Sequence, residues 1–239
     1  MNRVRAWHGA PAEFHAGELP TPSPGDIDVW LVRPDRPTVV AGSTQRGVID
    51  EALAADAGLA VTRRRTGGGV VVVEPVGTVW LDVVLARGDH RVSDDVGRSF
   101  DWVGATLGAG LRSAGVAASV HEGPGEWDEL GRLVCFAGVG PGEALDATGR
   151  KVLGLSQRRT RSQVRFQVVA YSEVPVAATL AGLPDAALPG GRSEAAHELT
   201  RRTAGLGDAR PAAWWADRLA AALAGSNSSP VTGYGCVDV

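Results

Sequence analysis

The chain has few of the residues and segments that metal sites, disulfide frameworks and membrane anchors require. Its 239 residues include two cysteines and five histidines, and their spacing matches neither a metal-binding motif nor a disulfide framework. No apolar run approaches the roughly 20 residues that span a bilayer. The N-terminal segment also has no apolar core of signal-peptide length. These absences predict a cytoplasmic protein with no metal site and no membrane partner.

Lysine is almost missing, because Lys151 is the only one and arginine supplies the other positive side chains. The formal net charge of −3 gives no reason to expect nucleic acid or an anionic membrane as a partner. Positive charge is instead local, at residues 63–65, 150–151, 158–161 and 201–202. A single lysine beside such a cluster is a candidate for a functional role.

The length and the hydrophobic content of 44% suit one large domain with a sizeable core. Proline and glycine are frequent near the start, so residues 1–28 are predicted to be a loosely structured lead-in. Residues 29–225 are predicted to form the folded domain, and residues 226–239 a flexible tail. Within the domain we expect a helix at 93–115 and a strand at 133–138. Strands and helices alternate without clean βαβ units, which favours an α+β fold with a mixed, largely antiparallel sheet flanked by helices.

The densest positive charge runs directly into the least constrained backbone, in the stretch RRRTGGGVVVV that begins at Arg63. This stretch is not a phosphate-binding P-loop, because no Gly-Lys-Ser/Thr follows the glycines and a strand comes next. Backbone N–H groups that no Cβ shields can hold phosphate or carboxylate oxygens, and Arg64 and Arg65 add fork-shaped donors. We therefore predict an anion site at Gly67–Gly69. A glycine bulge flanked by solvated arginines is the alternative.

A second stretch, GRKVLGLSQRR, places Lys151 at a turn-to-strand junction and Gly154 three residues later. The two stretches resemble the R-R-x-[ST]-G-G-G and G-[RK]-K-[IV]-x-G-x-[AS] signatures of the biotin/lipoate protein ligase superfamily, and lipoate-protein ligase A most closely. The upstream segment VVAGSTQ is similar to the superfamily's Gly-x-x-Gln loop at Gly42 and Gln45. The three matches cover residues 38–170 in the same order.

The resemblance implies an α+β catalytic domain related to biotin protein ligase and class II aminoacyl-tRNA synthetases. Such enzymes use ATP and Mg²⁺ to activate lipoate or octanoate as an acyl-adenylate. They then transfer the acyl group to a lysine of a lipoyl domain, in a 2-oxoacid dehydrogenase or the glycine-cleavage H protein. The resemblance assigns acyl-adenylate binding to Gln45, Arg64, Arg65, Gly67, Gly68, Gly69 and Gly154. It assigns contact with the α-phosphate and the acyl carbonyl to Lys151.

An apolar wall for an eight-carbon chain is expected beside these residues, at Val70, Val71 and Trp80. Each methylene that such a wall buries contributes about 0.8 kcal/mol, so an acyl chain can bind without polar contacts. The glycine and lysine signatures together favour an ATP-dependent ligase, because the adenylate phosphate gives the arginines and Lys151 a charge to neutralise.

The chain departs from the ligase pattern at two points. VVVEPVGT stands where the family has His-Asp-x-Gly-Asn, and no Asn-Asp precedes the lysine. The stretch LVCFAG instead resembles octanoyltransferases, in which a cysteine followed by phenylalanine forms an acyl thioester. In that alternative Cys135 attacks octanoyl-acyl carrier protein and no ATP is used. The other interpretation is that Cys135 is a buried strand residue without a catalytic role, which is the usual state of a free cysteine. A third alternative is a non-catalytic acyl- or nucleotide-binding subunit that needs a separately encoded accessory protein.

Overall fold

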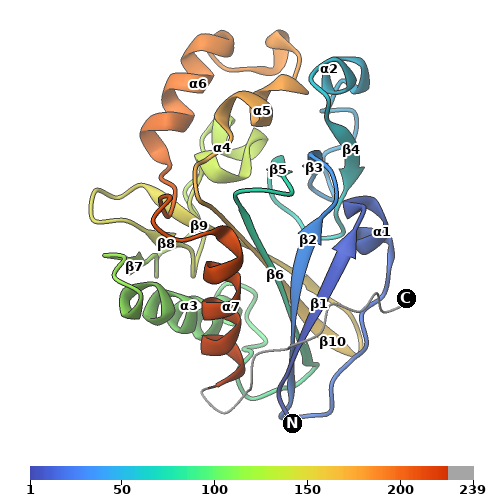
Figure 1. Ribbon diagram of the computed structural model, residues 1–239, viewed down its shortest axis with the longest axis vertical. Helices are drawn as coiled ribbons and strands as arrows, with labels where there is room; N and C mark the ends of the chain where they lie inside the picture. Colours follow the sequence, from blue (N-terminus) through green and yellow to red (C-terminus); the bar gives the residue numbers. More distant parts are fainter. Residues whose placement is uncertain (226–239) are drawn as a thin grey trace.

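Seven strands form the larger of two sheets in the computed structural model, which describes residues 1–225 (Figure 1). Their order across the sheet is β1 (Arg3–Gly9), β2 (Ile27–Pro34), β6 (Thr78–Ala86), β10 (Gln163–Tyr171), β9 (Lys151–Arg159), β8 (Ala144–Leu145) and β7 (Ser119–Val120). The β1–β2 pair is parallel and every other neighbouring pair is antiparallel. The smaller sheet has the order β4 (Ala60–Arg63), β3 (Thr38–Ala41), β5 (Val71–Val73), with β3 parallel to β4 and antiparallel to β5. The predicted mixed, largely antiparallel architecture is confirmed.

Helices cover both sheets. One face of the larger sheet packs against α3 (Asp101–Ser113) and α7 (Ala212–Ala224). The other helices are α1 (Pro11–Ala16), α2 (Glu51–Asp56), α4 (Glu129–Leu133), α5 (Val176–Ala181) and α6 (Gly191–Arg202), with short 3₁₀ turns η1 (Arg98–Phe100), η2 (Cys135–Ala137) and η3 (Asp185–Ala187). None of the helices within residues 1–225 is both long enough and apolar enough to cross a membrane.

Strand β6 divides the interior into two cores, because its successive side chains point to opposite faces of the sheet. Val79, Leu81 and Val83 lie in the core that includes α3 and α7. Trp80 and Val84 lie in the second core, which includes the valines of the smaller sheet. The face of β6 that carries Trp80 therefore looks into the space between the two sheets, where the candidate site lies.

The prediction of a loose lead-in at residues 1–28 is wrong. Strand β1 pairs with β2 along its whole length, with Arg3 opposite Asp28, and these two side chains form an ion pair at 3.1 Å. Most of the prolines and glycines that suggested a loop lie between α1 and β2, so they mark a connection inside the domain. The predicted tail, residues 226–239, lies outside the described residues.

Two further local predictions are wrong in part. Residues 133–138 form the end of α4 and the turn η2 rather than a strand, and Val134 makes only one isolated bridge, to Val70. The helix expected at 93–115 begins only at Asp101; before it, the Asp95 carboxylate accepts a hydrogen bond from the backbone N–H of Arg98, the first residue of the turn η1.

Candidate active site

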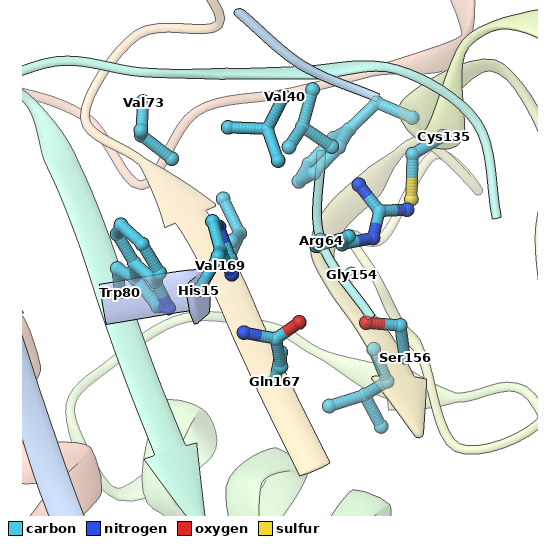
Figure 2. A pocket seen from close by; sticks show the side chains of 13 residues that line it. His15, Val40, Arg64, Val73, Trp80, Cys135, Gly154, Ser156, Gln167 and Val169 are labelled. Carbon is cyan, nitrogen blue, oxygen red and sulfur yellow. The ribbon is translucent and has the colours of Figure 1, made fainter. Parts of the chain in front are cut away.

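An apolar cavity with about 380 Å³ of empty volume lies between the two sheets (Figure 2). The connection between β5 and β6 creates it, because these consecutive strands belong to different sheets and do not pair with each other. Val71 and Trp80, both expected as wall residues, line the cavity. Val70 does not line it, and lies fully buried behind the wall.

A second hollow, with about 760 Å³ of empty volume, adjoins this cavity and opens to the surface. Its lining includes the three glycines of Gly67–Gly69, Lys151 and the half-exposed ring of Trp127. We call it the entrance hollow. Cys135 and Ser156 line both the cavity and the entrance hollow, so the cysteine lies at the junction between them.

The glycine loop is pressed between two other backbone segments. A Cβ on Gly42 would overlap the carbonyl oxygen of Gly68, and a Cβ on Gly69 would lie 2.6 Å from the backbone nitrogen of Cys135. Gly68 itself has φ of +96°, a conformation that side chains disfavour. The N–H groups of Gly67–Gly69 donate to no acceptor among the described residues. The loop is therefore held in place while its donors remain available to an anion.

Arg64 holds this loop from the cavity side. Its guanidinium donates to the carbonyl oxygens of Gly67, at 2.8 Å, and Gly69, also at 2.8 Å. Burial lowers the pKa of Arg64, while the Cys135 side chain acts in the opposite direction. Figure 2 shows the Cys135 sulfur facing this guanidinium, whose buried Nη1 has no hydrogen-bond partner within residues 1–225. The sequence grouped Arg65 with it, but Arg65 turns outward, where it pairs with Glu18 and donates to a carbonyl of α1.

Lys151 is buried beneath the cysteine, with 1% of its surface exposed. Its ammonium donates to the carbonyl oxygens of Cys135, at 2.8 Å, and Gly138, at 3.0 Å. The third partner is the carboxylate of Glu143, at 2.6 Å. All three ammonium protons therefore have acceptors, and the lysine fixes the turn that carries the cysteine.

Glu143 is a site residue that no sequence motif indicated. Besides Lys151, its carboxylate accepts hydrogen bonds from the backbone N–H of Gly140, at 2.7 Å, and of Leu155, at 2.8 Å. The signal in the sequence is weak, because it consists of one acidic residue eight positions before the only lysine. The short hairpin of β8 and β9 is what brings the two together.

Two other predicted residues, Gln45 and Gly154, hold the surrounding segments in place, and Gly154 also lines the cavity. Gln45 accepts from the backbone N–H of Gly42, at 3.0 Å, and donates to the carbonyl oxygen of Leu133, at 2.9 Å. It thereby joins the loop before α2 to the end of α4. At Gly154, a Cβ would lie 3.1 Å from the ring of Phe136, so glycine allows β9 to pack closely beneath η2.

His15, from α1, also lines the cavity, although the composition of its segment predicted a loose lead-in. Its ring stacks on Trp80 with centroids 5.0 Å apart. Burial, together with the positive charges of Arg165 and Arg64, lowers its pKa from 6.5 to about 3. The imidazole is therefore neutral at physiological pH.

The floor of the cavity is a chain of buried hydrogen bonds. Ser156 donates to Thr66, Thr66 donates to Gln167 at 2.8 Å, and Gln167 donates to Asp82 at 3.1 Å. Asp82 is also the partner of Arg165. Among residues 1–225, no three histidine, cysteine or acidic side chains are grouped so that they could hold a metal ion.

The catalytic-domain family of lipoyl protein ligases A and B matches residues 21–181. The chain belongs to this family. The match covers the glycine loop, the cysteine turn and Lys151, and it confirms the resemblance found in the sequence. Among curated proteins, no sequence matches the chain.

Solved structures similar to this family member share its fold. A lipoate-protein ligase A bound with ATP aligns with a TM-score of 0.55 at 19% identity, over 76% of this chain and 64% of that chain. A lipoate protein ligase of Thermoplasma acidophilum with bound lipoic acid aligns with a TM-score of 0.58 at 19% identity, over 83% of this chain and 69% of that chain. A bipartite lipoate protein ligase of the same organism, with its E2 lipoyl domain, aligns with a TM-score of 0.66 at 16% identity, over 93% of this chain and 81% of that chain. The chain thus spans less than two thirds of the first of these ligases.

Proposed function

We propose that this member of the lipoyl ligase family transfers an octanoyl or lipoyl group to a lysine of a lipoyl domain through a thioester on Cys135. One observation carries the proposal: the thiol lies where the apolar cavity meets the entrance hollow and faces the buried guanidinium of Arg64. The thiolate of a cysteine is a competent nucleophile for acyl transfer. The acceptor would be a lipoyl domain of a 2-oxoacid dehydrogenase or the glycine-cleavage H protein.

The cavity suits the acyl chain. Its walls are largely apolar side chains, among them Val71, Val73 and Trp80. Burial of the six methylenes of an octanoyl group would contribute roughly 5 kcal/mol. With the chain in the cavity, the acyl carbonyl would lie at Cys135, where cavity and entrance hollow meet.

The first step is a thioester exchange with octanoyl-acyl carrier protein. The Cys135 thiolate attacks the acyl carbonyl, a new sulfur–carbon bond forms, and the donor's thiolate leaves and takes up a proton. Charge on the carbonyl oxygen builds up beside the glycine loop, whose N–H groups have no acceptor among the described residues. Fixed donors aimed at such a charge lower the barrier.

In the second step, the neutral amine of the acceptor lysine attacks the enzyme thioester. An amide bond forms, the sulfur–carbon bond breaks, and the Cys135 thiol is restored. Lys151 acts here as a positioning residue, because its three protons are bound to Glu143 and to two carbonyls of the cysteine turn.

The ATP-dependent ligase remains the second candidate, and a specific feature favours it. The free N–H groups of Gly67–Gly69 fit phosphate oxygens as well as they fit a carbonyl oxyanion. One similar structure holds ATP and another holds lipoic acid. In this route ATP, with Mg²⁺, would supply the energy to activate a free carboxylic acid, and the glycine loop would hold its phosphate.

The deciding experiment offers both donors to the purified protein. An apo lipoyl domain is incubated with octanoyl-acyl carrier protein, or with octanoate, ATP and Mg²⁺, and its mass is followed. We expect octanoylation from the carrier protein, abolished in Cys135→Ser. Octanoylation from octanoate and ATP that survives in Cys135→Ser would assign the chain as a ligase instead. Failure of both donors, even with candidate accessory proteins added, would leave the non-catalytic acyl-binding subunit.

A further inference from the structure

A cluster of arginines surrounds a third hollow, with about 840 Å³ of empty volume. Arg46, Arg63, Arg65 and Arg158 line its rim, and Arg64 lies at its base. No acidic side chain belongs to its lining. We call it the basic hollow.

The positive charge of the basic hollow is largely uncompensated. Arg46 and Arg63 are exposed, and their side chains make no hydrogen bond or ion pair within residues 1–225. Arg65 and Arg158 share a single carboxylate, that of Glu18. The whole chain carries a net charge of −3, so this concentration does not reflect a generally basic protein. Guanidinium groups in such an arrangement attract carboxylates and phosphates.

The basic hollow lies directly beside the route to Cys135. Arg64 and His15 line both this hollow and the acyl cavity. On β9, Arg158 follows immediately after Ser156 and Gln157, which line the entrance hollow. An acidic macromolecule bound to the arginines would therefore sit at the edge of the opening through which a thioester reaches the cysteine.

We propose that the basic hollow docks the acyl carrier protein that delivers the acyl group. This inference rests on the proposed thioester route. The acyl carrier protein and the lipoyl domain differ in the charge that each brings to the basic hollow. The donor presents its acyl group on an arm joined through a phosphodiester, which is an anion. The acceptor presents a lysine, which is a cation before it reacts and is repelled by clustered arginines. Acidic side chains of the carrier and the phosphate of its arm both suit guanidinium donors.

The test is the double variant Arg46→Glu/Arg63→Glu, compared with Arg161→Glu. Arg161 is also exposed and makes no ion pair among the described residues, but it does not line the basic hollow. Each protein is assayed with octanoyl-acyl carrier protein and with the octanoyl thioester of N-acetylcysteamine, which lacks both the protein and the phosphate. Thermal unfolding checks that the variants fold.

We expect the double variant to raise KM for the carrier protein by roughly tenfold or more, because charge reversal at a rim slows association. Its kcat/KM for the small thioester and the behaviour of Arg161→Glu should match the wild type. Added salt should raise the wild-type KM for the carrier protein more steeply than that of the variant.

Other results would overturn the inference in distinguishable ways. An equal loss with the small thioester would make the arginines part of the chemical site. A raised KM for the lipoyl domain alone would assign the hollow to the acceptor. If the wild type accepts neither thioester, the proposed function fails and the inference fails with it. In that case, loss of the ATP-driven reaction in the double variant would identify the hollow as a nucleotide site.

Discussion

Replacement of Glu143 by glutamine should destabilise the protein strongly, although the two side chains have nearly the same shape. The Glu143 carboxylate is the only acidic partner of Lys151 among the described residues, at 2.6 Å, and both side chains are almost fully buried. Removal of one partner from a buried ion pair costs about 3–5 kcal/mol, because the other charge is left uncompensated. The Glu143 carboxylate accepts hydrogen bonds from the Lys151 ammonium and from two backbone N–H groups. The NH₂ group of glutamine would face at least one of these donors and could not accept from it.

The assay is urea unfolding, followed by the fluorescence of the seven tryptophans. We expect Glu143→Gln to lower the free energy of unfolding by about 3 kcal/mol or more. The control Glu122→Gln, at an exposed position, should change it by less than about 0.5 kcal/mol.

A double-mutant cycle extends this prediction. Lys151→Met removes the cation but leaves the Glu143 carboxylate its two backbone N–H donors. In the double variant Lys151→Met/Glu143→Gln no uncompensated charge remains, so it should be more stable than the sum of the two single changes by roughly 1 kcal/mol or more. A loss below about 1 kcal/mol in Glu143→Gln, with no coupling to Lys151, would refute the view that this pair holds the cysteine turn.

Three further predictions concern the cavity and its loop. The pKa of His15 is about 3 in the folded protein and 6.5 in the unfolded chain. Protons therefore bind the unfolded chain preferentially, and the protein loses stability as the pH is lowered from about 6.5 towards 3. Between pH 8 and pH 5 the stability of His15→Gln relative to wild type should therefore rise by about 2 kcal/mol, and a constant difference would contradict the burial of a neutral imidazole. Gly42→Ala should displace the glycine loop and slow transfer at least roughly tenfold, whereas Gly67→Ala, whose Cβ meets nothing within 4 Å, should leave the fold intact. Arg64→Lys should slow acyl-enzyme formation from a small thioester about 10- to 100-fold, because the paired hydrogen bonds to the glycine loop are lost. Arg65→Lys should not slow it, and equal rates for the two variants would contradict the separate roles assigned to Arg64 and Arg65.

The fold class and much of the candidate site were predictable from contiguous sequence. The glycine loop and the segment around Lys151 each depend on a few neighbouring residues, and Arg64, Lys151 and Cys135 do come together. The glycines of the loop also lie close to two other backbone segments, at Gly42 and at the cysteine turn, and the predicted anion site did not include this packing.

The features that were missed depend on contacts between distant segments. LVCFAG has the composition of a strand, but Gly131 and Gly138 pack against each other and fold the segment back on itself as a turn. His15 reaches the cavity only because β1 joins the sheet beside β2 and carries α1 with it. Glu143 lies next to Lys151 only through the β8–β9 hairpin. None of these partnerships leaves a local pattern, so periodicity and short motifs could not reveal them.

The thioester on Cys135 can be tested by the intact mass of the enzyme after exposure to octanoyl-acyl carrier protein without any acceptor. We expect a gain of one octanoyl group, located on the Cys135 peptide, released by hydroxylamine, and passed to an apo lipoyl domain that is added afterwards. Cys135→Ala should gain no mass. An unmodified wild-type enzyme that nevertheless octanoylates the lipoyl domain from octanoate and ATP would rule out the Cys135 thioester.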